Sequence, residues 1–298
     1  MNRKNQLIID FRDYRRDGKG RRVKSSSLSV MNPYKILTSP PMKTVSCIVM
    51  LFSLAGKKAV ITGCATGIGK GMAAGLARAG ADIIALDIGD LEDTRRTVEN
   101  LGRECRCYHV DLSVSSDVEV WIRLLEEAGH VDILCNNAGM QFRKNAFEYP
   151  EEMFDKVIAV NLKAPYRLSQ KAAIHFRDKG LKGKIINTAS LFTTFGGVEV
   201  SGYTCSKHGV MGMTRALSNE FAPYGICVNA IAPGYIATEL TKAIWSDSKR
   251  RQPMDERIPA GRWGTPDDFE GPAVFLASRA SDYITGIMIP IDGGYSAR

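Results

Sequence analysis

The chain has 298 residues, of which 44% are hydrophobic and 24% are charged, a composition typical of a soluble globular protein. Its seven cysteines are an odd number spread thinly along the chain, and no second pair complements Cys105 and Cys107. We therefore expect neither a disulfide scaffold nor a metal site. The absence of a run of 18 apolar residues argues against a membrane span.

The excess positive charge is confined to one end of the chain. Residues 1–50 hold 11 Lys/Arg and 3 Asp/Glu, which is the whole net charge of +8, whereas residues 51–298 hold 29 of each sign. We predict a basic, disordered extension over residues 1–50, because the segment has no apolar period, and a folded domain over residues 51–298. A neutral body argues against nucleic acid as a partner. Three aspartates in the extension count against a mitochondrial presequence, so we expect a cytoplasmic protein.

From Lys57 onward, short apolar runs alternate with longer helical patterns. We predict strands over 59–62, 82–87, 107–110, 131–135, 184–188, 226–231 and 287–291. We predict helices over 67–79, 91–101, 116–128, 151–177, 203–221 and 266–278. Apolar strands separated by helices indicate a parallel sheet covered on both faces. The sequence therefore predicts an α/β fold, a single-domain Rossmann-type doubly wound sheet of about seven strands.

The first predicted strand runs into a glycine-rich turn, Thr62 to Gly69, at which a helix begins. Gly63 would allow the tight turn, Gly67 would let backbone approach a pyrophosphate, and Gly69 would let the helix pack close to the strand. The free amides at the start of the helix, from Thr66 and Ile68 onward, favour phosphate binding. This pattern predicts a dinucleotide site.

Asp87 ends the second strand, 18 residues after Gly69. A carboxylate in that position can accept both ribose hydroxyls of the adenosine half and repels a 2′-phosphate. Neither Ile88, which follows it, nor Thr66 in the glycine turn is basic. The sequence therefore favours NAD as the cofactor, and NADP less.

Tyr203 and Lys207 stand four residues apart, on one face of a predicted helix. A free tyrosine is a poor base at neutral pH, and a nearby ammonium group lowers the pKa of a phenol. Ser190 ends the preceding strand, 13 residues earlier, where its hydroxyl can meet a substrate oxygen. The three residues together predict acid–base chemistry on an alcohol or a ketone.

These features resemble the short-chain dehydrogenase/reductase family over about residues 53–298. The motifs that carry the resemblance are Thr62 to Gly69, Asp111, Asn136-Asn137-Ala138-Gly139, Asn161, Ser190, Tyr203, Lys207 and Pro233-Gly234. The resemblance implies a nicotinamide cofactor, hydride transfer to or from a small-molecule alcohol or ketone, and a homotetramer built through two long helices.

The resemblance also implies a role for each matching residue. Tyr203 would be the general acid/base, Lys207 would lower its pKa and hold the nicotinamide ribose, and Ser190 would orient the substrate oxygen. Asn161 would hold a water that extends the proton relay. The remaining cofactor contacts would be Asp111 to adenine, Asn137, Ala138 and Gly139 to the ribose side, and Pro233, Gly234, Ile236 and Thr238 to the nicotinamide.

Within the family, the segment Arg257 to Gly264 is similar to the 2-deoxy-gluconate / 2-dehydro-3-deoxy-gluconate 3-dehydrogenase group. Substrate contacts are expected from Phe192 and Arg143, besides the catalytic residues Ser190 and Tyr203. That group has arginines where Phe142 and Glu199 stand here. A sugar acid, a polyol and a bulkier secondary-metabolite ketone therefore all stay open as substrates, because an anion needs a fixed positive partner.

The polar segment of about residues 235–258 would form a lid over the substrate, since closing lids that exclude water are common in enzymes. An alternative from another class is a nucleotide-binding sensor or scaffold without turnover. The intact set of Ser190, Tyr203 and Lys207 argues against that alternative.

Overall fold

The structure is a computed structural model that describes residues 14–16, 22–24, 49–114, 120, 124 and 127–298. The chain divides into two units, one before and one after residue 46. In the first unit, β1 (Tyr14–Arg16) pairs antiparallel with β2 (Arg22–Lys24). Apart from residues 49 and 50, the rest of the predicted extension lies outside the described residues, as does most of the predicted helix over 116–128.

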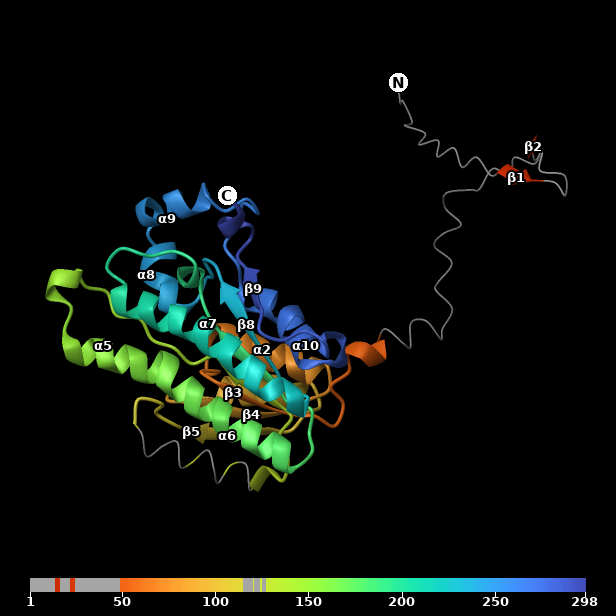
Figure 1. The fold of residues 1–298 in the computed structure, drawn as a ribbon. Coiled ribbons are helices and arrows are strands. Elements are labelled where there is room, and N and C mark those ends of the chain that lie inside the picture. The colour runs from red at the N-terminus through yellow and green to blue at the C-terminus, as the bar shows by residue number, and fades with distance from the viewer. Residues whose placement is uncertain (1–13, 17–21, 25–48, 115–119, 121–123, 125–126) are drawn as a thin grey trace. The chain divides into compact units, whose positions relative to one another are not determined.

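The second unit is built on one sheet of seven strands in the order β5-β4-β3-β6-β7-β8-β9 (Figure 1). The strands are β3 (Lys58–Thr62), β4 (Asp82–Asp87), β5 (Cys105–His109), β6 (Ile133–Asn136), β7 (Lys184–Thr188), β8 (Cys227–Pro233) and β9 (Met288–Ile291). Every neighbouring pair is parallel. The predicted α/β fold is confirmed, and the bounds of all seven strands lie within two residues of those predicted.

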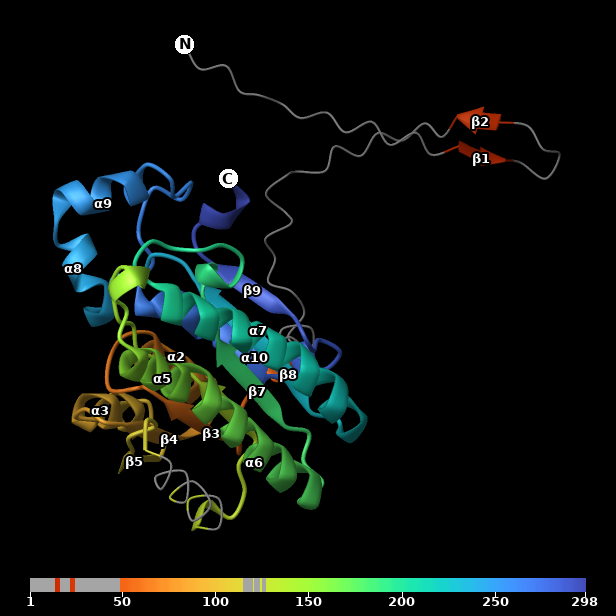
Figure 2. The ribbon, with the colours of Figure 1, turned by 60° about the vertical axis from the view of Figure 1, so that its left-hand side comes forward.

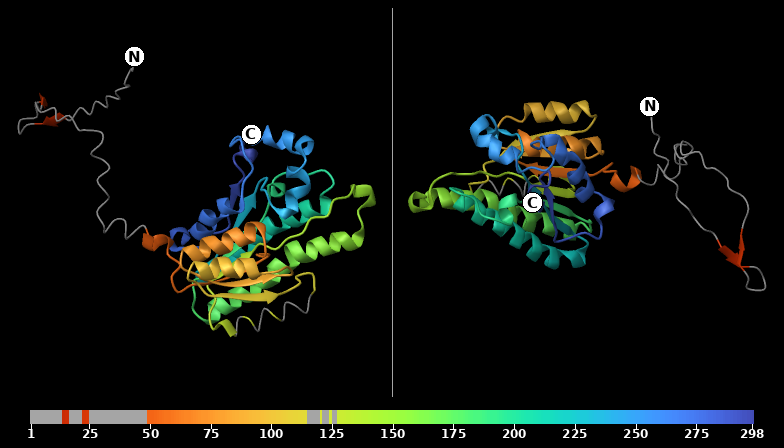
Figure 3. Two further views of the ribbon diagram at one scale, coloured as in Figure 1. Left: turned by 180° about the vertical axis from the view of Figure 1, so that it is seen from behind. Right: turned by 90° about the horizontal axis from the view of Figure 1, so that it is seen from above.

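Helices cover both faces of this sheet (Figures 2 and 3). One face carries α2 (Gly67–Arg78), α3 (Glu92–Asn100) and α10 (Glu270–Ala277), and the other carries α5 (Glu151–Ile158), α6 (Ala164–Asp178) and α7 (Ser201–Phe221). Alternation along β3 explains the two layers, because successive strand residues point to opposite faces. Val60 belongs to the apolar cluster that includes Leu168 of α6, whereas its neighbour Ile61 belongs to the cluster that includes Met72 of α2.

The long helix predicted over 151–177 is interrupted. A π-helical turn, Ala159–Lys163, separates α5 from α6 and holds the buried Asn161 at its centre. The predicted helix over 266–278 likewise begins as a 3₁₀ turn, Pro266–Phe269, before α10. Sequence periodicity cannot detect such local changes in helical winding. Among the helices of the described ranges, none is long and apolar enough to cross a membrane.

The strand order reverses between β3 and β6, since β4 and β5 extend the sheet on one side and β7 to β9 on the other. In open α/β sheets a crevice forms outside the carboxyl ends of the strands at such a reversal. The predicted glycine turn follows β3 directly, so this part of the fold positions the candidate site.

Candidate active site

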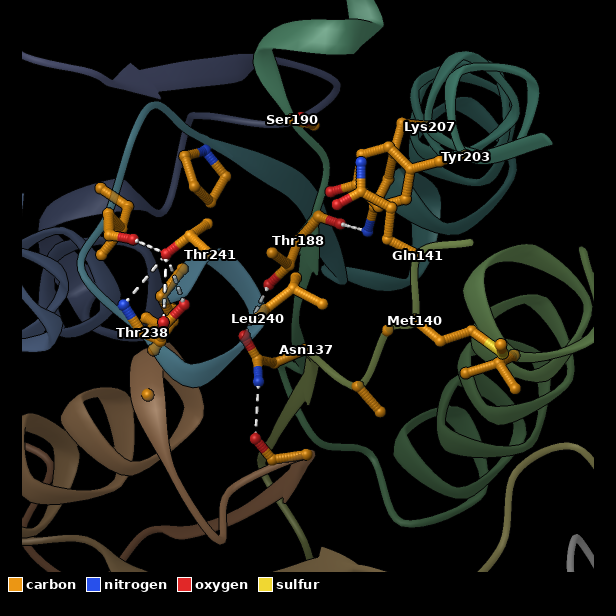
Figure 4. A pocket seen from close by; sticks show the side chains of 18 of the residues that line it. Asn137, Met140, Gln141, Thr188, Ser190, Tyr203, Lys207, Thr238, Leu240 and Thr241 are labelled. Carbon is orange, nitrogen blue, oxygen red and sulfur yellow. Dashed lines mark hydrogen bonds between the residues drawn. The ribbon is translucent and has the colours of Figure 1, made fainter. Parts of the chain in front are cut away.

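A cavity of about 440 Å³ lies at the carboxyl ends of the strands (Figure 4). Most of the residues predicted from the sequence line it, namely Gly63, Thr66, Gly67, Ile68, Asp87, Asp111, Asn137, Ala138, Gly139, Arg143, Ser190, Phe192, Tyr203, Lys207, Pro233, Gly234, Ile236 and Thr238. Gly69 and Asn161 are the two predicted site residues outside this lining.

The glycine turn has the shape that a phosphate site needs. Gly63 has φ +67°, and a Cβ on it would lie 2.6 Å from the Cα of Ala138. A Cβ on Gly69 would lie 2.1 Å from the carbonyl oxygen of Gly63, so this glycine lets the helix approach the strand although it does not face the cavity. Thr66 precedes α2 without a side-chain capping bond. The amides of the first helical turn are thus free for an anion, and these residues fit a dinucleotide.

Asp87 lines the cavity at the end of β4, and both of its carboxylate oxygens accept backbone amides. The amide of Ala65 donates to Oδ2 and the amide of Gly89 to Oδ1, each at 2.8 Å. These bonds fix the carboxylate and leave further lone pairs for ribose hydroxyls.

Cations are scarce around Asp87. Among the described residues that line the cavity, the lysines and arginines are Arg143, Lys156 and Lys207, and none of them belongs to the turn after β4. Arg95 and Arg96 of α3 pair with Glu92 instead. A 2′-phosphate on the adenosine ribose would therefore meet a carboxylate rather than a cation from these residues.

One chain of hydrogen bonds connects the glycine turn to the catalytic helix. The Asn137 amide nitrogen Nδ2 donates to the carbonyl of Gly63 at 2.8 Å, and its Oδ1 accepts from the Thr188 hydroxyl at 3.3 Å. The carbonyl of Thr188 in turn accepts from Lys207 Nζ at 2.6 Å. In Figure 4 dashed lines join Lys207 to Thr188 and Thr188 to Asn137.

Tyr203 and Lys207 project from α7 toward the end of β7 (Figure 4), as their spacing predicts. Lys207 Nζ lies 5.5 Å from the centroid of the Tyr203 ring. Burial lowers the pKa of Lys207 to about 8. Burial also raises the pKa of Tyr203, and a hydrogen bond with Ser190 opposes that rise.

The direction of the Tyr203 shift differs from the one that the sequence suggests. We expected the neighbouring ammonium of Lys207 to lower the pKa of the phenol. In the structure the loss of solvation dominates, because the phenol is enclosed and removal from water disfavours its charged form. Enclosure also disfavours the charged ammonium form of Lys207, which lowers its pKa. Loss of solvation is therefore the main cause of both pKa shifts.

The side chain of Asn161 is hydrogen-bonded to the backbone of Met140 and to the side chain of Ser206. Its Oδ1 accepts from the amide of Met140 at 2.8 Å, and its Nδ2 donates to the carbonyl of Met140 at 2.9 Å and to the hydroxyl of Ser206 at 3.0 Å. Both amide hydrogens are used, so a water at this residue would meet one of its oxygens rather than its NH₂ group. The expected role of Asn161 as a water holder stays a prediction.

The end of the cavity near Ser190, Tyr203 and Lys207 has an aromatic wall, which includes Phe192, Phe195 and Tyr235. Ser190 Oγ accepts from the amide of Phe192 at 3.2 Å, which holds its hydroxyl at the end of β7. The ring of Phe192 meets that of Tyr203 edge-on at 6.1 Å. Arg143 is exposed at the cavity and has no ion pair with the described part of the chain.

Several lining residues were not predicted individually, although Tyr235, Leu240 and Ile244 lie within the segment of about residues 235–258 that the sequence analysis expects to form a lid. Met140, Gln141, Phe195, Tyr235, Leu240 and Ile244 also face the cavity. Tyr235 directly follows the Pro233-Gly234 motif and could have been found from that position. The others come from loops and from the segment after β8, which has no motif and consists of short helices, among them α8 (Lys242–Trp245) and α9 (Ser248–Asp255).

Comparison with known proteins assigns this arrangement to a family. The family described as enoyl-(acyl carrier protein) reductase matches residues 63–296. The 2-dehydro-3-deoxy-D-gluconate 5-dehydrogenase of Escherichia coli K12 is 49% identical over 252 residues, which are 84% of this chain and 100% of that protein. The chain belongs to the short-chain dehydrogenase/reductase family. It is accordingly an NAD(P)-dependent oxidoreductase that acts on CH–OH groups, and the predicted resemblance is confirmed.

Two solved structures of short-chain dehydrogenases resemble it closely. One, from Agrobacterium tumefaciens, is provisionally described as a 2-deoxy-D-gluconate 3-dehydrogenase with bound NADP; it is 42% identical, has a TM-score of 0.78, and the match covers 83% of this chain and 99% of that one. The other is a gluconate 5-dehydrogenase of Burkholderia cenocepacia in complex with NADP and tartrate, 34% identical with a TM-score of 0.79, covering 84% and 99%.

Replacing Tyr203 with Phe should lower turnover by about 10²–10⁴-fold, because the hydroxyl that moves the proton is lost while the ring still packs. Affinity for NADH, measured by fluorescence, should stay within twofold of the original. Tyr283, which is fully exposed shortly before β9 and does not line the cavity, provides the control, since Tyr283→Phe removes the same atom outside the site. Retention of more than a tenth of the activity by Tyr203→Phe would exclude it as the acid/base.

Proposed function

We propose that the protein interconverts a hydroxyl and a keto group on a sugar acid of the 3-deoxy-gluconate class. The observation that carries this proposal is that one cavity combines Ser190, Tyr203 and Lys207 with the exposed Arg143, which has no ion pair among the described residues. The first group suits a carbonyl, and the second suits a carboxylate. The names of the relatives support the same class, although they differ in the carbon that is oxidised.

The proton is handled by Ser190, Tyr203 and Lys207. When bound, the nicotinamide group would supply or accept the hydride. In oxidation Tyr203 Oη takes the proton of the substrate hydroxyl, and in reduction it returns that proton to the keto oxygen. Ser190 Oγ donates to the same substrate oxygen and fixes its position. Lys207 Nζ, held on the carbonyl of Thr188, supplies a positive charge beside the phenol whenever it is protonated.

The remaining predicted residues would hold the dinucleotide. We propose that the amides from Thr66 to Gly69 bind the pyrophosphate, that Asp87 and Asp111 meet the adenosine end, and that Asn137 to Gly139 line the ribose. Ile236 and Thr238, after Pro233-Gly234, would meet the nicotinamide end.

We further propose that NAD is the preferred cofactor, because Asp87 faces the cavity without a cation from the turn that follows β4. Solved relatives hold NADP, so the preference needs a direct test. The double substitution Asp87→Ala with Ile88→Arg should shift the ratio of kcat/KM values toward NADP by about tenfold or more, since it removes a repulsive charge and adds a phosphate partner. If the unmodified enzyme already prefers NADPH, this role of Asp87 is wrong.

Arg143 provides the test of the substrate class. With a panel of sugar acids and matched neutral polyols, we expect turnover of an acid and a rise of its KM by about 10–100-fold in Arg143→Gln, since a hydrogen bond to a charged group is worth about 1.5–3 kcal/mol. Neighbouring Lys144 pairs with Glu148, so Lys144→Gln is the matched control and should change KM little. Turnover of neutral ketones alone would favour the secondary-metabolite alternative, which the aromatic lining residues Phe192, Phe195 and Tyr235 accommodate.

We also propose a cytoplasmic homotetramer in which residues 1–50 take no part in folding or catalysis. Exposed apolar side chains along α5 and α6, namely Phe154, Tyr166 and Ile174, support a contact between copies there. A chain that begins at Met50 should have four times the mass of one protomer by light scattering, with unchanged kinetics. Its melting temperature should match that of the full chain, because the described buried core starts at Leu54. A fall of more than a few degrees would make the extension part of the fold.

A further inference from the structure

The last residues of the chain form a tightly bonded turn. Both oxygens of the Asp292 carboxylate accept backbone amides at 2.9 Å, one from Gly294 and one from Ser296. The carbonyl of Gly293 accepts from the amide of Ala260 at 3.0 Å. The terminus is thus attached to the stretch that follows α9, and it lies near α9 in Figure 2. This turn presents Tyr295, which is only 6% exposed.

Tyr295 packs behind the aromatic wall of the cavity. Its ring centroid lies 5.1 Å from that of Tyr235 and 6.1 Å from that of Phe195. Tyr235 and Phe195 line the cavity, whereas Tyr295 does not. The terminal tyrosine therefore supports two lining residues without facing the cavity itself.

The segment of residues 239–256 contains the short helices α8 and α9. The Tyr295 ring contacts Arg257, directly after the carboxyl end of this segment. The Arg257 guanidinium lies 4.3 Å from the centroid of the Tyr295 ring, a cation–π distance. One residue earlier, the carbonyl of Glu256 accepts from the Arg298 guanidinium at 3.1 Å. The carboxyl end of the segment is thus fastened by the last turn of the chain.

The beginning of that segment meets the same cluster. The carbonyl of Tyr235 accepts from the amide of Gly264 at 3.0 Å, and the carbonyl of Gly264 accepts from the amide of Ala237 at 2.9 Å. The ring of Trp263 lies 5.2 Å from that of Tyr235, and its Nε1 donates to Asp255 at 2.8 Å. Both ends of the segment therefore converge on the rings around Tyr295.

We propose that Tyr295 is a positioning residue that sets substrate affinity: it holds Tyr235 and Phe195 in the cavity wall and, through Arg257, keeps the 239–256 segment closed over the substrate. The apolar cluster that contains Tyr295 consists of Leu191, Ile258, Phe195, Tyr235 and Trp263, and it includes no residue of the glycine turn or of the turn after β4, where we place the cofactor. The effect on substrate rests on the proposed function, but the effect on the segment does not.

Closure of the 239–256 segment can be measured by limited proteolysis. Lys249, Arg250 and Arg251 are exposed on α9, so trypsin can cut there whenever the segment opens. Cleavage at these bonds, followed by mass spectrometry, requires no substrate and separates them from cuts elsewhere in the chain.

In Tyr295→Leu we expect cleavage at residues 249–251 to be at least fivefold faster and the KM of the substrate to rise about tenfold. The affinity for NADH should stay within twofold, and kcat should change less than KM. The separate variant Tyr295→Phe should keep the slow cleavage and the low KM of the unmodified protein, because the ring that contacts Tyr235, Phe195 and Arg257 remains. Tyr283, which is fully exposed shortly before β9, supplies the control Tyr283→Leu, with no change in any readout.

Arg257→Met keeps the proposal testable if Tyr295→Leu does not fold, because Arg257 is exposed and its replacement disturbs no core. It should accelerate the same cleavage by a factor of two or more. Unchanged cleavage in Arg257→Met and in any folded Tyr295→Leu would overturn the proposal, as would an equal loss of affinity for NADH. Faster cleavage without turnover of any sugar acid would instead refute the proposed substrate and leave the closure role intact.

Discussion

The site depends above all on the hydrogen bonds of one amide, that of Asn137. Its side chain lies between the ends of β3 and β7 and bonds to the carbonyl of Gly63 on one side and to the hydroxyl of Thr188 on the other. Its backbone amide donates to the hydroxyl of Thr62 at 3.0 Å. These bonds fix the position of the glycine turn relative to Thr188, whose carbonyl binds Lys207. Hydride transfer between a bound dinucleotide and a substrate requires such fixed relative positions.

Most of the fold could be predicted from the sequence because its strands are short apolar runs with clear boundaries. The strand from Asp82 to Asp87 and that from Lys184 to Thr188 have the predicted bounds. The interruption at Asn161 could not be predicted, because it depends on a distant backbone group at Met140. A helical period is a local property, whereas a π turn that satisfies a remote amide is a tertiary one.

The residues of the site can likewise be divided into those that the sequence predicts and those that it does not. Residues on the turns after strands, such as Gly63 and Ser190, were found because their position in the chain determines their position in space. Of the aromatic wall only Phe192 was predicted, since Phe195 and Tyr295 are a hundred residues apart and meet only after folding. The direction of the Tyr203 pKa was also beyond the sequence, because it depends on how completely the cavity excludes water.

The buried position of Lys207 has a consequence for the energetics of the whole molecule. Its pKa of about 8 in the folded protein lies below that of an unfolded lysine, about 10.4. Between these values the unfolded chain binds a proton that the native state lacks, so this residue makes the free energy of unfolding rise with pH across that window, by up to about 1.4 kcal/mol per pH unit. Below it, the native state bears the full cost of an ammonium group held away from water. A ligand whose hydroxyls accept from Nζ favours the ammonium form, so its binding near pH 8 draws a proton from solution.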